Sequence, residues 1–257
     1  MTTPEPPQWS LSIVSHGHWP RVLDLLSDCA RLLDPSRHEM VLTLDVPESV
    51  DAAGLPWQGP LRLIRNQRSQ SFGANHNAAL AAARGRYVAL LDPDLRLSSD
   101  PFPRLASALE AADVGVVATR VREPDGCVAD HARPLPTPRR LLARHVGGAR
   151  ASYSPELSTA LDVDWVAGLF MGLRRTTWQQ LGGFDPRYRL YCEDVDLCLR
   201  AWNASLRVQV VPGEWVLHPP RRRTLRSSQH FYRHCASLLR LWRSAAYREF
   251  RHRHASS

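Results

Sequence analysis

Two carboxylates stand where a short apolar segment of this chain ends. Asp92 and Asp94 flank Pro93 directly after the apolar run from Tyr87 to Leu91. Ligands of open α/β sheets bind at the carboxyl ends of the strands, where such carboxylates can hold a divalent cation and, through it, a phosphate group. Asp and Pro are also frequent in turns, so a plain turn is the alternative interpretation of this stretch.

A second acidic pair opens the segment YCEDVDLCLRAW. Glu193 and Asp194 precede residues that share one face at helical spacing, namely Val195, Cys198, Leu199 and Trp202. The start of a helix favours carboxylates and lowers their pKa. A positioned carboxylate can also remove the proton of an attacking hydroxyl. A catalytic role and simple helix capping are therefore both possible for this acidic pair. A third candidate, His218, follows a predicted strand over 206–211 and is either a ligand or an ordinary strand-end histidine.

Strand-like and helix-like patterns alternate around these residues. Apolar runs predict strands over 11–15, 40–44, 61–64, 87–91 and 114–118, and helical patterns begin at Pro20, 72, Pro101 and 176. Gly85 is expected to end the second helix, and Thr176 or Thr177 to cap a later one. Such alternation predicts an α/β fold with a mostly parallel sheet flanked by helices. Residues 133–158, rich in Pro, Arg and Gly, are expected to form a loop region that is either mobile or faces an acceptor.

Four stretches, in order, resemble family 2 glycosyltransferases of the GT-A fold. They are IVSHGH, FGANHNAAL, the triplet Asp92-Pro93-Asp94, and GGFD followed by YCEDVDLCLR. Within that family the chain is most similar to bacterial rhamnosyltransferases. The resemblance implies a single GT-A domain over 1–257, with a Rossmann-like nucleotide-sugar-binding half (10–121), an acceptor-binding half (122–220) and a basic, amphipathic helical tail (221–257).

The resemblance also implies an activity. It is the metal-dependent, inverting transfer of a hexose or deoxyhexose, with rhamnose as one candidate, from a nucleotide diphosphate sugar to a hydroxyl of a saccharide or lipid-linked glycan. Asp94 and His218 would hold the divalent metal, Mg²⁺ or Mn²⁺, and Asp92 would contact the donor ribose or a metal-bound water. Asp194 would act as the catalytic base, with Glu193 orienting the acceptor or the base.

The resemblance to the family implies further donor-binding and acceptor-binding residues. Donor contacts are expected from Ser15, His16, Asp45, Gly73 and Asn77, and acceptor contacts from Trp165, Gly168 and Phe170. Core or loop polarity explains His16 and Asp45 equally well, and Asn77 could instead cap its helix. Apolar strand residues such as Trp165 and Phe170 are more often core than ligand-binding.

The composition of the chain excludes several other classes of protein. The chain has 257 residues, 44% of them hydrophobic, and a net charge of +8 that arginine alone carries because lysine is absent. Its five cysteines lack C-x-x-C spacing, so neither a zinc site nor a disulfide framework is indicated. We find no membrane-spanning run and no signal-peptide pattern, and expect a cytoplasmic protein.

The arginines concentrate towards the C-terminus, on a predicted helix with Phe231, Cys235, Leu238, Leu239, Trp242 and Ala246 along one side. Three interpretations stay open: packing against the domain, peripheral contact with the inner face of a membrane, or a homodimer. A nucleic-acid-binding protein is a rival class, but zinc-finger and helix-turn-helix signatures are absent and no nucleic acid is expected as partner. A noncatalytic sugar-nucleotide-binding or scaffold protein is the other rival.

Overall fold

A mixed sheet forms the centre of the protein. The computed structural model describes residues 6–50, 54–147, 158–219 and 228–254. Six strands are parallel to one another: β1 (Trp9–Ser15), β2 (His38–Leu44), β3 (Leu61–Arg65), β4 (Tyr87–Leu91), β6 (Val114–Arg122) and β11 (Arg207–Leu217). β10 (Phe170–Arg174) lies antiparallel between β4 and β6, while β5 (Arg96–Leu97) and β8 (Leu161–Asp162) run antiparallel to β11. The short strands β7 (Ala132–Arg133) and β9 (Trp165–Val166) pair separately.

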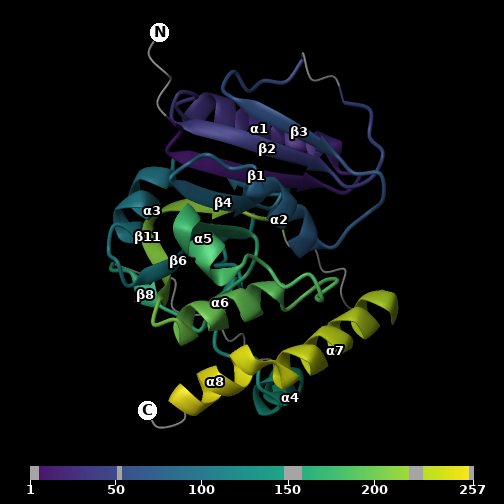
Figure 1. The fold of residues 1–257 in the computed structure, drawn as a ribbon, viewed down its shortest axis with the longest axis vertical. Coiled ribbons are helices and arrows are strands. Elements are labelled where there is room, and N and C mark those ends of the chain that lie inside the picture. The colour runs from purple at the N-terminus through teal and green to yellow at the C-terminus, as the bar shows by residue number, and fades with distance from the viewer. Residues whose placement is uncertain (1–5, 51–53, 148–157, 220–227, 255–257) are drawn as a thin grey trace.

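Helices cover both faces of this sheet (Figure 1). α1 (Trp19–Leu32) and α3 (Phe102–Leu109) pack against one face. The other face carries α2 (Phe72–Ala81), α5 (Arg175–Leu181) and α6 (Glu193–Asn203). Beyond α6 lie α4 (Pro138–Gly147), α7 (Ser228–Arg243) and α8 (Ala245–His254), at the opposite end of the molecule from β2 and β3. The predicted α/β class is confirmed.

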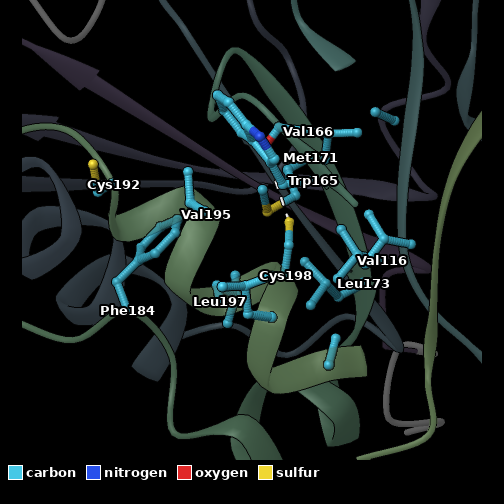
Figure 2. Packing of buried hydrophobic residues seen from close by; sticks show 14 of the residues in the cluster. Val116, Trp165, Val166, Met171, Leu173, Phe184, Cys192, Val195, Leu197 and Cys198 are labelled. Carbon is cyan, nitrogen blue, oxygen red and sulfur yellow. Dashed lines mark hydrogen bonds between the residues drawn. The ribbon is translucent and has the colours of Figure 1, made fainter. Parts of the chain in front are cut away.

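The core under α6 fixes the acidic end of that helix. Figure 2 shows Cys198 of α6 pointing towards Met171 of the sheet, and Val195, Leu197 and Leu173 belong to the same buried cluster. Each of these side chains is at most 2% exposed, and full burial of such a side chain stabilises the fold by roughly 1.5–3 kcal/mol. The first turn of α6 is therefore held rigidly against β9 and β10.

Two predicted helix signals are wrong. α2 ends at Ala81, and Gly85 instead allows the chain to approach β1, because a Cβ there would lie 2.7 Å from the Ser10 nitrogen. α5 begins at Arg175, with no side-chain cap from Thr176 or Thr177. α5 ends at its C-cap Gly182, which adopts the left-handed conformation at φ 73°.

The expected loop region over 133–158 contains helix α4, so that prediction is wrong for 138–147; residues 148–157 lie outside the described ranges. Leu141 packs against the core, and the Trp242 indole donates a hydrogen bond to the Pro136 carbonyl at 2.8 Å. These tertiary contacts order a segment whose composition favours a loop.

The C-terminal segment forms two helices rather than one. α7 and α8 meet at Ser244, and their buried side chains are Leu238, Leu241, Ala246, Tyr247 and Phe250. Phe231 and Leu239, predicted on the packed side, are 59% and 47% exposed. The residues before Ser228, over 220–227, lie outside the described ranges.

Candidate active site

The Asp92-Pro93-Asp94 triplet is a turn and also a cluster of oxygen ligands. The Asp94 nitrogen donates to Asp92 Oδ1 at 2.8 Å, and the Leu95 nitrogen donates to the Asp92 carbonyl at 3.1 Å. Pro93 fixes its own φ and restricts the residue before it, which limits the turn to few geometries. The turn interpretation is therefore confirmed, and the turn directs the two carboxylates. A metal ion held by them stays a prediction.

His218 completes this cluster from β11. Its backbone nitrogen donates to the Arg122 carbonyl at 2.8 Å, which fixes the residue just beyond the strand end. One ligand atom from each of Asp92, Asp94 and His218 lies within 4.8 Å of the others. Carboxylate oxygens suit Mg²⁺ and Mn²⁺, and an imidazole is a common ligand of other divalent metals, so these residues fit a divalent metal.

Asp94 is already neutralised by an arginine that the sequence did not single out. Arg21, in the first turn of α1, donates through Nη1 to both carboxylate oxygens, at 2.8 and 2.9 Å. The Asp94 side chain is 1% exposed and that of Arg21 is 48% exposed. Any cation at Asp94 would share the carboxylate with this guanidinium or displace it.

Asp45, at the end of β2, is the centre of a polar network. Its carboxylate contacts the His16 ring nitrogen at 2.9 Å and accepts hydrogen bonds from the Gln70 amide and the side chains of Asn66, Ser69 and Asn75. Burial alone would raise the pKa of Asp45, but these hydrogen bonds outweigh it and lower the pKa to about 2. The network ties the chain after β3 to the ends of β1 and β2, and a contact of Asp45 or His16 with the donor stays a prediction.

The loop between β1 and α1 is wrapped around Glu48. Ser15 Oγ donates to this carboxylate at 2.9 Å, and the backbone nitrogens of Gly17 and Trp19 donate to it at 3.1 Å each. Glu48 was missed in the sequence because it lies in an irregular loop without a periodic pattern. Its negative charge now stands at the amino end of α1, where the helix dipole favours it.

Gly73 and Asn77 pack against Phe184, in the segment before α6, which is a different part of the chain from the sheet edge. A Cβ at Gly73 would lie 2.8 Å from the Phe184 Cβ. The Asn77 amide donates to the Phe184 carbonyl and accepts from the Phe184 nitrogen, both at 2.8 Å. Asn77 does not cap α2, because the hydroxyl of Ser71 does so. Both residues thus join α2 to the segment before α6, and donor contact by either is still only predicted.

The acidic pair of α6 follows an unusual backbone. Tyr191 and Cys192 are both left-handed, at φ 73° and 68°, a conformation that costs a non-glycine residue roughly 1–2 kcal/mol. This reversal starts α6 so that Asp194 Oδ2 accepts from the Gly168 nitrogen at 3.0 Å, while Oδ1 accepts from Val195 at 2.8 Å. Backbone strain of this kind concentrates at functional sites.

Burial overrides the helix dipole at this pair. Burial, followed by the charge of Asp194, raises the pKa of Glu193, and burial also raises the pKa of Asp194. The lowering expected from the helix end alone was therefore wrong. Glu193 Oε2 has no hydrogen-bond partner among the described residues. Asp194 as a whole residue is partly exposed, and burial gives its carboxylate a raised affinity for a proton.

A short backbone segment joins the two acidic pairs. The Leu169 carbonyl accepts from the Asp92 nitrogen at 2.8 Å, and the adjacent Gly168 nitrogen donates to Asp194. Gly168 is confined, since a Cβ there would meet the Phe72 ring at 3.1 Å. The segment 168–169 thus places both carboxylate pairs at one edge of the sheet.

The two aromatic residues predicted to shape the acceptor pocket are core residues. Phe170 is 1% exposed and its ring centroid lies 5.7 Å from that of Phe102, on the α3 side of the sheet. Trp165 is 7% exposed, packs in the cluster under α6 (Figure 2) and donates its indole hydrogen to the Pro134 carbonyl at 3.0 Å. Their side chains stabilise the sheet beneath the site, which corrects the predicted acceptor contact.

Several known proteins are similar to this chain in sequence. The family model for glycosyl transferase family 2 matches residues 10–168. Rhamnosyltransferase WbbL of Escherichia coli (strain K12) is 28% identical over 225 residues, which are 80% of this chain and 81% of that protein. The N-acetylglucosaminyl-diphospho-decaprenol L-rhamnosyltransferase of Mycobacterium tuberculosis (strain H37Rv) is 32% identical over 148 residues, covering 51% of this chain and 46% of that protein.

Solved structures support the fold. The crystal structure of GalNAc-T7 with UDP, GalNAc and Mn²⁺ superposes with a TM-score of 0.66 at 16% sequence identity. The match covers 83% of this chain and 43% of that one. The fold is therefore GT-A.

Proposed function

The chain belongs to glycosyl transferase family 2, and from that membership we propose that it transfers rhamnose from a nucleotide diphosphate sugar to a hydroxyl of a lipid-linked glycan, with inversion at the anomeric carbon. Transfer of a glycosyl group is the activity of the family. The rhamnosyl donor is proposed because two relatives, WbbL and the decaprenol-linked enzyme, are named as rhamnosyltransferases. The acceptor class is proposed from the name of the second.

One observation supports this proposal above the others: Asp92 and Asp194 are both bonded to the segment 168–169. A glycosyltransferase needs a donor side that stabilises a leaving diphosphate and an acceptor side that removes a proton. Separate acidic pairs at one sheet edge meet both needs, and their fixed spacing favours productive orientation of two substrates.

On the donor side, Asp92, Asp94 and His218 would hold the divalent metal. When bound, such an ion offsets the negative charge that builds on the departing diphosphate. Arg21 stands beside Asp94 and brings a permanent positive charge to the same edge. The metal requirement and the choice between Mg²⁺ and Mn²⁺ are part of the proposal.

On the acceptor side, Asp194 is the proposed base. Its raised pKa brings its proton affinity closer to that of the hydroxyl group it must deprotonate than an ordinary carboxylate would be. The Gly168 nitrogen orients Oδ2, and buried Glu193 supports the same turn of α6. One base without a protein nucleophile agrees with single-step inversion.

The proposal is tested with a thermal-shift panel followed by a transfer assay. Nucleotide diphosphate sugars, including dTDP-rhamnose, are screened with Mn²⁺, with Mg²⁺ and with EDTA. We expect a metal-dependent rise in melting temperature for a rhamnose donor, and release of the nucleotide diphosphate when a lipid-linked acceptor is added. Stabilisation by other sugar nucleotides alone would refute the rhamnosyl assignment but leave family-level glycosyl transfer intact.

We also propose that the protein is cytoplasmic and contacts the inner face of the membrane through α4 and α7. Leu142 of α4 and Tyr232 of α7 are 67% and 74% exposed. Arg140 and Arg144 flank Leu142 in sequence, and Arg233 follows Tyr232. Apolar side chains ringed by cationic ones suit an anionic lipid surface. None of the helices in the described ranges is long and apolar enough to cross a bilayer.

Vesicle flotation tests this contact. Replacing Tyr232 and Leu239 with Ser should weaken binding to vesicles rich in anionic lipid by about tenfold, because two exposed apolar groups no longer insert. Neutral phosphatidylcholine vesicles serve as control. Unchanged flotation of the double variant would contradict the contact, and sedimentation velocity on the same proteins tests the alternative of a homodimer through this face.

A further inference from the structure

Two arginines stack on one tryptophan beyond the end of the core. Arg120 and Arg122 lie two residues apart in β6, so their side chains leave the same face of the strand. Trp215 of β11 stands opposite Arg120 in the register. The guanidinium carbons of Arg120 and Arg122 lie 4.1 and 3.9 Å from the centroid of its ring. Cation–π contact of this kind orients both guanidinium groups.

Neither guanidinium group is paired directly with a carboxylate of the described residues. Among the described residues neither forms an ion pair within 4 Å, whereas Arg21, Arg96 and Arg200 each contact a carboxylate. Arg120 donates to the Gly213 carbonyl, but its Nε is buried without a hydrogen-bond partner. Glu214, the acidic residue whose charge acts on Arg120, accepts a hydrogen bond from Ser99.

The proximity of the two positive charges has an electrostatic cost. Burial, and then the positive charge of Arg122, lowers the pKa of Arg120. Two like charges beside one indole are stabilised by a bound anion, and guanidinium groups bind phosphate through paired hydrogen bonds. Such a cluster is suited to a phosphate rather than to a neutral sugar.

The cluster lies next to the site and on its acceptor side. The Arg122 carbonyl accepts the hydrogen bond from the His218 nitrogen. Val116 and Ala118, which precede the arginines on the same face of β6, pack in the cluster under α6. Val117 and Val121 point to the opposite face. The arginines therefore share a face of the sheet with the helix that carries Asp194.

We propose that Arg120, Arg122 and Trp215 form a subsite for the phosphate or diphosphate group of an anionic acceptor. The inference rests on the proposed glycosyl transfer and adds the acceptor's charge to it. A phosphate held at the ends of β6 and β11 would anchor the acceptor beside the donor, while its sugar hydroxyl reaches the base on α6.

Calorimetric titration with inorganic pyrophosphate in the presence of EDTA tests the subsite. EDTA removes divalent metal, so pyrophosphate cannot bind through a metal ion at Asp92. We expect the wild type to bind, and R120Q/R122Q to bind about tenfold or more weakly. The variant R187Q/R253Q removes two surface arginines elsewhere and should bind like the wild type. Arg122 is exposed, so R122Q alone is a second test if the double variant fails to fold.

A short prenyl diphosphate, geranyl diphosphate, separates the two sources of phosphate. Tighter binding than pyrophosphate supports a lipid-linked acceptor, and equal binding supports a soluble phosphorylated saccharide. No binding by the wild type, or equal binding by R120Q/R122Q, would overturn the subsite. Loss of metal-dependent nucleotide-sugar binding in R120Q/R122Q would also overturn it, by placing the arginines on the donor side. A wild type that binds pyrophosphate but no nucleotide sugar refutes the proposed function alone.

Discussion

Replacing Asp194 with Asn is expected to lower the rate of glycosyl transfer by about 10²–10⁴-fold, the usual contribution of a general base. The amide has nearly the same shape and can still accept from the Gly168 nitrogen, but it cannot take up the acceptor proton. Binding of the nucleotide sugar should be kept, because the donor cluster of Asp92, Asp94 and His218 is built from other parts of the chain. Turnover assays and donor-induced thermal shifts measure the two effects separately.

Asp196, two residues further along α6, provides the matched control. It pairs with Arg200 at 2.8 Å, so Asp196→Asn should lower the melting temperature while folded enzyme keeps its turnover rate. The wild-type rate should rise with pH as Asp194 loses its proton, with an apparent pKa above the ordinary carboxylate value because burial raises it. Full activity of Asp194→Asn, or the same pH dependence in its residual rate, would refute the assignment.

Replacing Asp94 with Asn should weaken Mn²⁺-dependent donor binding by about 100-fold or more, since loss of even a supporting contact to a metal ligand costs 10–100-fold. The fold should survive, because Arg21, which loses its partner, is half exposed and can be solvated. The readout is the difference in melting temperature with and without Mn²⁺ in the presence of the donor.

Arg21→Met is the informative control for this result. It breaks the same ion pair from the other side and leaves the carboxylate of Asp94 available. The Mn²⁺ response should be kept or strengthened in Arg21→Met and lost in Asp94→Asn. Equal loss in both variants would mean that the pair only stabilises the edge, and an unchanged response in Asp94→Asn would exclude Asp94 as a ligand.

Local signals located much of the sheet edge in advance. The strand Tyr87–Leu91 has the predicted boundaries, because a purely apolar run ending in two carboxylates leaves few alternatives. The first turn of α6 was also found, since its buried stripe repeats at helical spacing. In both cases the residues that define the element are neighbours in sequence.

Contacts between residues that are distant in the sequence could not be predicted in the same way. Arg21 is one of many arginines, and only folding brings it to Asp94, 73 residues away. Glu48 likewise gains its meaning from three donors around the β1–α1 loop. Phe170 was misplaced because the alternation of a strand predicts two faces without indicating which one meets the ligand.

The backbone bridge at 168–169 bears on how such an enzyme can change acceptor preference over evolution. The separation between Asp92 and Asp194 is set by a peptide N–H and a peptide carbonyl, which every amino acid except proline provides. Side chains around this edge of the sheet can therefore be exchanged without moving Asp92 and Asp194 apart. Selectivity becomes a separately adjustable trait, and Gly168 is the position where this freedom is most restricted, because the Phe72 ring would have to shift to admit a Cβ.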